Sequence, residues 1–502
     1  MNSAATTMPQ FHPAKAFAYI SFGCSALLLY TISSLTGGIA ASVPAIGIPI
    51  AVFLLSQVFV RGARFNTDQV VSPKNWMLLL FSLQLLVIPL IVIITGFAQG
   101  ELPHLPSHAA ITAAVLLQSS AYVSCMTGFI LVRRWKESRG NPPSTDSLIA
   151  SVDQRAGAPR AVIAVTAVIG VVGLVLRFRS LADLTGYFTG TSPIAYDLTS
   201  AASVVATTAQ SLSGLLLPYL GVAFALLGCR AIEQARRRSG RRARNAITEI
   251  TVLGGLAAAY GLYSYSRGNV VMPILAMLAT YSMRLRRVRA LAVGVAAIAI
   301  VLAVVAVGSF RTAYFLNQAG VSVQLKSPSL TDTLQVYGQG PQFLGYLLDT
   351  TPANAVPMWG STLASSALSP VPVLGKGFRA TSTTVLYNDL IYGRNVATDQ
   401  IVPLEGELFW NFDIPGVVVG FFGVGVAVGV LEASARRARR TFTCYVINYA
   451  GFWVAFMVVA SVSILSQEFI YFMVPGLLAL LGTGRLQRRP TAPLRQSLGE
   501  VR

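Results

Sequence analysis

Long apolar stretches separated by short polar connections make up most of this chain. A helix needs roughly 17 to 25 mainly apolar residues to cross a bilayer, and about twelve stretches meet or approach that length. We predict spans near residues 15–35, 38–60, 76–98, 109–132, 160–177, 210–229, 246–263, 268–283, 290–309, 414–432, 443–462 and 468–483. The pattern therefore predicts an all-α polytopic membrane protein whose first span is retained rather than cleaved.

The composition agrees with this class and explains the charge. Of the 502 residues, 54% are hydrophobic and only 11% are charged, yet the formal net charge is +19. Basic residues beside membrane spans stay in the cytoplasm, and placing both termini there assigns about 30 of the 38 Lys and Arg residues to that side. The positive charge thus reflects orientation in a membrane, and nucleic-acid binding is not expected.

One external connection, 310–413 between the ninth and tenth spans, is far longer than the others. Featureless loops of that length are rare in compact proteins, and this one has many apolar residues. From Asp332 to Leu348 they recur at helical spacing, which predicts a helix lying on a surface; an extended stretch is predicted from Ser369 to Gly377. We therefore divide the chain into a bundle of spans 1–9 (1–309), an extracytoplasmic cap loop (310–413), spans 10–12 (414–484) and a basic cytoplasmic tail (485–502).

Arg267 interrupts the apolar stretch from Ala246 to Tyr281, which has arginine clusters on both flanks. Because both flanks belong in the cytoplasm, the stretch crosses the membrane twice, and Arg267 lies at the turn on the external side. A guanidinium held at that boundary is costly, and such residues mark function more often than not.

Other external arginines could join Arg267. Planar, permanently charged guanidiniums bind the oxygens of a diphosphate in pairs. The candidates for such a site are Arg267, Arg311, Arg379 and Arg394. The alternative is that each pairs with an external carboxylate or reaches the lipid head groups.

Two carboxylates precede the point where the long loop re-enters the membrane. Glu405 and Glu407 alternate across Gly406, just before an aromatic run. In a partly dry place such a carboxylate gains basicity, so either is a candidate general base. The alternative is a pair of solvated rim carboxylates or partners of the nearby arginines.

Other chemistries find little support in the sequence. There is no phosphate-binding loop of Walker spacing, no DxD motif, and the four cysteines are scattered. Only three histidines occur, His12, His104 and His108, and none lies in the long loop. We expect neither a metal nor another cofactor.

Three features resemble the Wzy-type O-antigen and oligosaccharide repeat-unit polymerases, within the wider polymerase/ligase superfamily of polytopic glycosyltransferases. They are Tyr265–Ser266–Arg267–Gly268 opening a short apolar leg, the single dominant external loop late in the chain, and the re-entry from Gly406 to Gly416. The re-entry departs from the family pattern, since Asp413–Ile414–Pro415–Gly416 stands where a plain glycine is typical.

The resemblance implies a metal-independent transfer of a growing glycan from undecaprenyl diphosphate to a lipid-linked acceptor unit, outside the membrane. Arg267 and Arg311, aided by Arg379 or Arg394, would hold the diphosphate, and Glu405 or Glu407 would take the acceptor proton. The related ligases use a loop histidine, which this chain lacks. Partners expected are lipid-linked oligosaccharides, membrane lipids, a flippase and a chain-length regulator.

Two other functions compete with the polymerase. A transporter or flippase of lipid-linked sugars also has about twelve spans, but places its site at mid-membrane on broken helices. Another envelope glycosyl- or acyltransferase is the third possibility, although an acyltransferase calls for a suitably placed histidine.

Overall fold

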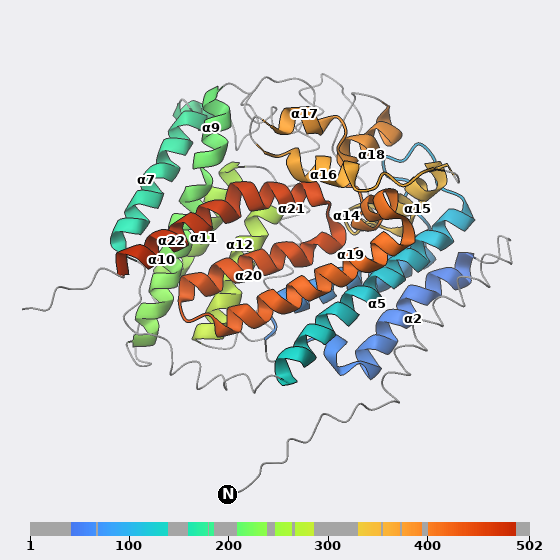
Figure 1. Ribbon diagram of the computed structural model, residues 1–502, viewed down its shortest axis with the longest axis horizontal. Helices are drawn as coiled ribbons and strands as arrows, with labels where there is room; N and C mark the ends of the chain where they lie inside the picture. Colours follow the sequence, from blue (N-terminus) through green and yellow to red (C-terminus); the bar gives the residue numbers. More distant parts are fainter. Residues whose placement is uncertain are drawn as a thin grey trace, which may run out of the picture.

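The computed structural model describes residues 42–66, 69–138, 159–178, 180–184, 208–237, 246–263, 267–285, 330–352, 355–371, 374–393 and 400–487. Every regular element within these ranges is helical (Figure 1). Helices occupy each predicted span that falls in them, whereas the spans predicted at 15–35 and 290–309 lie outside the described residues.

Seven helical segments are long and apolar enough to cross a membrane: Pro73–Thr95, His108–Trp135, Arg160–Arg177, Leu212–Arg236, Leu404–Arg437, Thr441–Val459 and Val462–Thr483. Two shorter apolar helices, Ala45–Phe59 and Thr251–Gly261, accompany them in the described ranges. The fold is thus an all-helical bundle of membrane-spanning character, and the total of twelve spans stays a prediction.

Two of these seven segments contain a π-helical turn, Pro73–Thr95 and Val462–Thr483. The elements are α2 (Ser42–Phe59), α3 (Pro73–Ser82), the π-helix η3 (Leu83–Val87), α4 (Ile88–Thr95), α5 (His108–Ser138), α7 (Arg160–Arg177), α9 (Thr208–Leu216), α10 (Pro218–Arg237), α11 (Ala246–Tyr263), α12 (Arg267–Arg284), α19 (Leu404–Arg437), α20 (Thr441–Phe456), α21 (Val462–Glu468), the π-helix η6 (Phe469–Met473) and α22 (Val474–Gln487). A π-helical turn contains about one residue more than an α-helical turn, so it changes the direction of the side chains that follow. Such turns are frequent at functional sites.

The bundle has two apolar cores. One surrounds Phe81, Tyr122 and Phe421 of α3, α5 and α19, where the rings of Phe81 and Tyr122 are 4.9 Å apart. The other surrounds Tyr260 of α11 and Tyr449 of α20. Side chains of α20 enter both cores, so this helix joins the two halves of the bundle.

Helices α5 and α19 approach closely at one level, where a side chain at Gly128 or Gly425 would collide with the other helix's backbone. Glycine is needed at such a crossing because it brings no Cβ. One turn nearer the start of α5, the Ser124 hydroxyl donates to the carbonyl of Val418 on α19, and both residues line the site described below.

Five short helices and the first part of α19 form a cap on one end of the bundle (Figure 1). The cap helices are α14 (Leu330–Tyr337), α15 (Pro341–Thr350), α16 (Ser361–Leu368), α17 (Gly375–Arg379) and α18 (Thr383–Tyr392), followed by residues 404–412 of α19. The cap has its own core, which includes Phe343, Tyr387 and Trp410. Burial raises the pKa of the Tyr387 phenol, which donates a hydrogen bond to the carbonyl of Phe343.

The cap differs in detail from the sequence prediction. The single surface helix predicted from Asp332 to Leu348 is two helices, broken at Gly338–Gln339–Gly340, where Gln339 has a φ of 53°. Helix α15 is largely buried because its apolar face packs on α5 and on the cap core. The stretch predicted as extended up to Gly377 contains the start of α17 at Gly375.

Hydrogen bonds tie the cap to the bundle. Gln335 of α14 accepts from the amide of Ala98 at 3.0 Å and donates to the carbonyl of Gly96 at 3.1 Å, just after α4 ends. Basic residues lie at the opposite helix ends: Arg284 donates to the carbonyl of Ala438, and Arg436 pairs with Glu432. The fold therefore separates a capped end from a basic end.

Candidate functional site

A sharp kink at Asp413 divides α19 into the cap segment 404–412 and the membrane-spanning segment from Ile414 onwards. Asp413 has φ 59° and ψ −161°, a region populated almost only by glycine. Pro415 explains where the break falls, because proline has no amide hydrogen and its ring clashes with the carbonyl four residues earlier. The Asp413 side chain accepts a hydrogen bond from the amide of Ile414 at 2.7 Å and so begins the second helix.

The kink leaves backbone carbonyls of α19 without a partner inside the helix, and amides of the cap donate hydrogen bonds to them. The amides of Met358 and Trp359 donate to the carbonyls of Trp410 and Asn411, both at 3.0 Å. The side chain of Asn411, fully buried, hydrogen-bonds the Thr362 hydroxyl. Unpaired buried carbonyls would be costly, so residues 358–362 hold the kinked ends of α19 in place.

Glu405 and Glu407 point into the interface between cap and bundle, and neither has any exposed surface. Glu405 accepts from the Gln84 side chain in η3 at 3.1 Å. Glu407 accepts from the amide of Val462, the first residue of α21, at 2.8 Å, and the hydroxyls of Ser366 and Thr383 lie beside it. Both carboxylates therefore bind protein groups on several helices, and an acceptor sugar has no access to them in this conformation.

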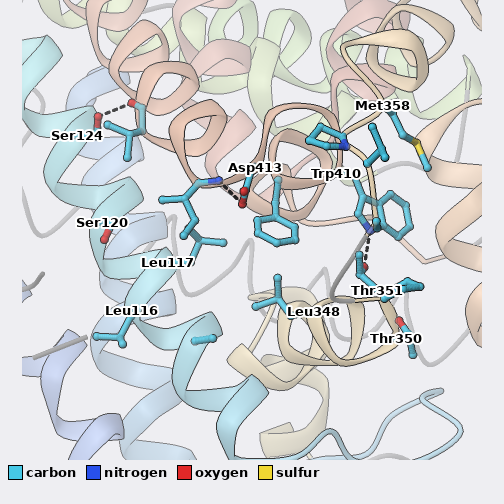
Figure 2. Close-up of a pocket in the computed structure, with 18 of the residues that line it drawn as sticks. Leu116, Leu117, Ser120, Ser124, Leu348, Thr350, Thr351, Met358, Trp410 and Asp413 are labelled. Atoms are coloured by element: carbon cyan, nitrogen blue, oxygen red, sulfur yellow. Dashed lines mark hydrogen bonds between the residues drawn. The ribbon is translucent and has the colours of Figure 1, made fainter. Parts of the chain in front are cut away.

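A groove opens beside the kink, between α5, the cap and α19 (Figure 2). Its cavity volume is about 990 Å³. Most of the residues that line it are apolar, among them Ala113 of α5 and Phe422 of α19. The polar side chains that line it are Ser120, Ser124, Thr127, Thr350, Thr351 and Asp413, with the Trp410 ring beside them. Of the described lining residues, Asp413 is the one that carries a charge.

A second region surrounds α21, and we call it the α21 region: α21 itself, residues 367–370 at the end of α16 and just after it, Arg379 at the end of α17, and Asn269 of α12. Ser466 of α21 donates to the carbonyl of Ala367, and Tyr471 donates to that of Pro370 at 3.1 Å. Arg379 is exposed, and its Nε donates to the carbonyl of Ser369 at 3.4 Å. Helix α21 thus holds the part of the cap that presents Arg379.

Glu468 ends α21, is 2% exposed and precedes the π-helical turn η6. Its carboxylate accepts hydrogen bonds from the Tyr449 hydroxyl at 3.5 Å and from the Asn269 side chain. Asn269 lies in the first turn of α12, two residues after Arg267. Glu468 therefore connects the start of α12 to α20 and α21, at the end of the bundle that carries the cap.

The structure accounts for the predicted diphosphate residues unequally. Arg379 is described and exposed, and the backbone of Arg267 begins α12. The Arg267 side chain and all of Arg311 and Arg394 lie outside the described residues. Within the described ranges, no group of three His, Cys, Asp or Glu side chains is placed to hold a metal ion.

Two functional candidates, Glu468 and Gln84, were not identified from the sequence, and Asp413 was noted there without a predicted role. Glu468 could have been noticed as an isolated acidic residue between two apolar segments, at the start of a predicted span, where such residues are often functional. Gln84 could have been noticed in the same way, because it is a polar amide within an apolar run of the sequence. Asp413 was visible as a departure from the expected glycine, but its placement in a groove depends on the fold.

Fold and site together define a helical membrane protein with a capped end and two contrasting regions beneath the cap. Comparison with known proteins finds no match: no family model, no curated protein and no solved structure matches this chain.

Proposed function

We propose that this protein polymerises lipid-linked oligosaccharide repeat units into a surface polysaccharide on the external face of the cytoplasmic membrane. Both termini would then lie in the cytoplasm and the cap outside. The reaction transfers a glycan from an undecaprenyl diphosphate-linked chain to an acceptor repeat unit, with no metal ion required.

The α21 region supports this proposal most strongly. Helix α21 packs against α16, which precedes the short helix α17 that carries Arg379, and Glu468 links α21 to Asn269 in the first turn of α12, which begins at Arg267. Two of the four predicted diphosphate-binding arginines thus belong to segments linked to α21, Arg379 through the residues after α16 and Arg267 through the start of α12. They are far apart in the sequence, so this linkage is a property of the fold.

The proposed chemistry is a displacement at the anomeric carbon. A hydroxyl of the acceptor sugar attacks that carbon, its bond to the diphosphate oxygen breaks, and undecaprenyl diphosphate leaves with the electron pair. Arg267, Arg311, Arg379 and Arg394 would stabilise the charge that develops on the diphosphate, a role that pre-positioned guanidiniums perform well.

A general base must accept the hydroxyl proton, and Glu405 and Glu407 stay the candidates proposed for that role. Since both are fully buried, either could reach an acceptor only after the cap moves. Their present contacts support a structural contribution in addition, because they join the cap to η3 and α21.

Reconstitution tests the proposal directly. The full-length protein is incorporated into liposomes with lipid-linked oligosaccharides taken from a strain that lacks the gene, in the presence of a chelator. We expect a ladder of glycans at multiples of the repeat unit, resolved by electrophoresis. A folded protein that yields no ladder, or that moves the lipid-linked unit across the bilayer without joining units, would contradict polymerisation.

A further inference from the structure

We propose that the groove between α5 and α19 binds an amine-bearing, zwitterionic phospholipid of the surrounding bilayer, with an acyl chain along the apolar wall and the ammonium at Asp413. This inference does not depend on the proposed function, because it concerns a different region of the molecule.

The position of the groove favours a hydrocarbon chain. On α5 its lining runs from Ala113 to Thr127, about 20 Å at 1.5 Å per residue. Apolar residues beside it on α19 are exposed, 41% for Ile414 and 69% for Val419. Such side chains on a membrane-spanning helix face lipid, so the groove opens to the bilayer rather than to bulk water.

The level of Asp413 matches a lipid head group. The helical segment from Ile414 to Arg437 is about 36 Å long at 1.5 Å per residue, slightly more than the ~30 Å of hydrocarbon in a bilayer. With its basic end at one surface, the kink lies at the other. The Asp413 carboxylate is therefore placed where the charged groups of phospholipids lie, and not among their chains.

Charge decides which head group fits. Asp413 is exposed, and it is the charged member of the described groove lining. A carboxylate at close range attracts an ammonium and repels a phosphate or diphosphate. The Ser120 hydroxyl lines the same groove and can donate to an ester or phosphate oxygen, whereas the hydroxyls of Thr350 and Thr351 donate to the carbonyls of Tyr346 and Leu347. An anionic lipid, and the diphosphate of a lipid-linked glycan, are both disfavoured here.

The backbone at Asp413 gives independent support. A side chain is held where glycine is the ordinary residue, with φ 59° and ψ −161°. Strain of this kind persists where the residue has a task that its side chain performs. The hydrogen bond from the Ile414 amide uses one carboxylate oxygen, which leaves the other available to a ligand in the groove.

Lipid retention by the intact protein tests the proposal. The full chain is equilibrated in nanodiscs with equal amounts of phosphatidylethanolamine and phosphatidylglycerol of matched chains, then released and examined by native mass spectrometry. We expect the wild type to retain phosphatidylethanolamine over phosphatidylglycerol. Asp413→Asn should reduce that preference about tenfold, the size of a lost charge-assisted contact, and Asp413→Lys should reverse it.

Filling the groove provides a second variant that keeps the charge. Ser120→Trp should remove the retained lipid, whereas Thr95→Trp, at an exposed position on α4, should leave retention unchanged. Thermal unfolding verifies that each variant is folded. If Asp413→Lys does not fold, Asp413→Asn and Ser120→Trp are enough to test the proposal.

Equal retention of both phospholipids by the wild type, or an unchanged preference in Asp413→Asn, would overturn the proposal. Retention that persists in Ser120→Trp would do the same. Added undecaprenyl diphosphate that displaces the phospholipid would also overturn it and would assign the groove to the substrate of the proposed polymerase. Absence of polymerase activity would leave this inference intact.

Discussion

The α21 region and the groove both adjoin the cap, yet they differ in the properties that select a ligand. The α21 region is polar: it joins the exposed Arg379, the buried Glu468 and Asn269 at the start of α12. The groove is mostly apolar, with Asp413 as its described charge. Under the two proposals above, the α21 region would take an anionic ligand and the groove a lipid with a cationic group. The comparison teaches that helix packing, rather than distance along the sequence, separates a polar region from an apolar one.

The largest expected effect comes from substituting Arg267, whose helix α12 begins at the α21 region. Arg267→Ala should reduce glycan elongation by at least ~100-fold, as does removal of one pre-positioned charge-stabilising donor in other enzymes. Single-unit glycan and protein abundance should be unchanged. Arg267→Lys should recover activity only partly, since an ammonium lacks the bidentate fork. Electrophoresis of surface glycan measures both variants.

The matched control for Arg267 is Arg437→Ala, at the exposed basic end of α19, which should keep full elongation. Normal long-chain polymer in Arg267→Ala would remove the diphosphate role from the start of α12.

Glu405→Gln and Glu407→Gln separate a catalytic from a structural role at the cap interface. Each substitution exchanges one accepting oxygen for a donor, so each should lower the stability by about 1 to 2 kcal/mol. Elongation is then measured at a temperature where both variants are folded. Replacing the general base should reduce elongation at least ~100-fold. Replacing a purely structural carboxylate should reduce elongation only in proportion to the fraction of protein that is folded.

If both Gln variants retain wild-type elongation, the base lies elsewhere. If neither changes the melting temperature, the hydrogen bonds to Gln84 and Val462 contribute less than their burial suggests.

Glu468→Ala probes the link between α12, α20 and α21. It removes the acceptor of the Tyr449 hydroxyl and the Asn269 amide, which should lower stability by about 2 kcal/mol. Tyr449→Phe removes one of these donors and should cost less. Thermal unfolding in detergent compares the two variants, and an equal or larger loss in Tyr449→Phe would show that Glu468 is not the shared acceptor.

The smallest expected effect is a gain in stability at the groove. Asp413→Gly relieves the backbone strain, and after the entropic cost of glycine about 1 kcal/mol should remain. Asp413→Ala, which keeps a Cβ in the strained conformation, is the control and should give no gain. Chemical unfolding measures both; an equal rise in the two variants would mean that the carboxylate, rather than the backbone, destabilises the kink.

The pattern of apolar stretches determined the helical fold class and the places of the helices. The interval 246–263 predicted from hydropathy is that of α11, and 160–177 is that of α7. This succeeds because a segment in a bilayer must satisfy its backbone hydrogen bonds within itself, which makes a long apolar run a helix whatever its neighbours are. The same reasoning placed Arg267 at the turn before the span predicted at 268–283, and α12 begins at this residue.

The tertiary structure alone decided how the polar side chains are used. From their sequence position, Glu405 and Glu407 were either candidate general bases or rim carboxylates, but residues 404–412 turn them towards Gln84 and Val462, which come from distant parts of the chain. The same kink opens a groove beside Asp413, although nothing local to Asp413 marks one. Burial and access depend on which helices pack together, and packing joins residues by shape and charge rather than by their order in the sequence.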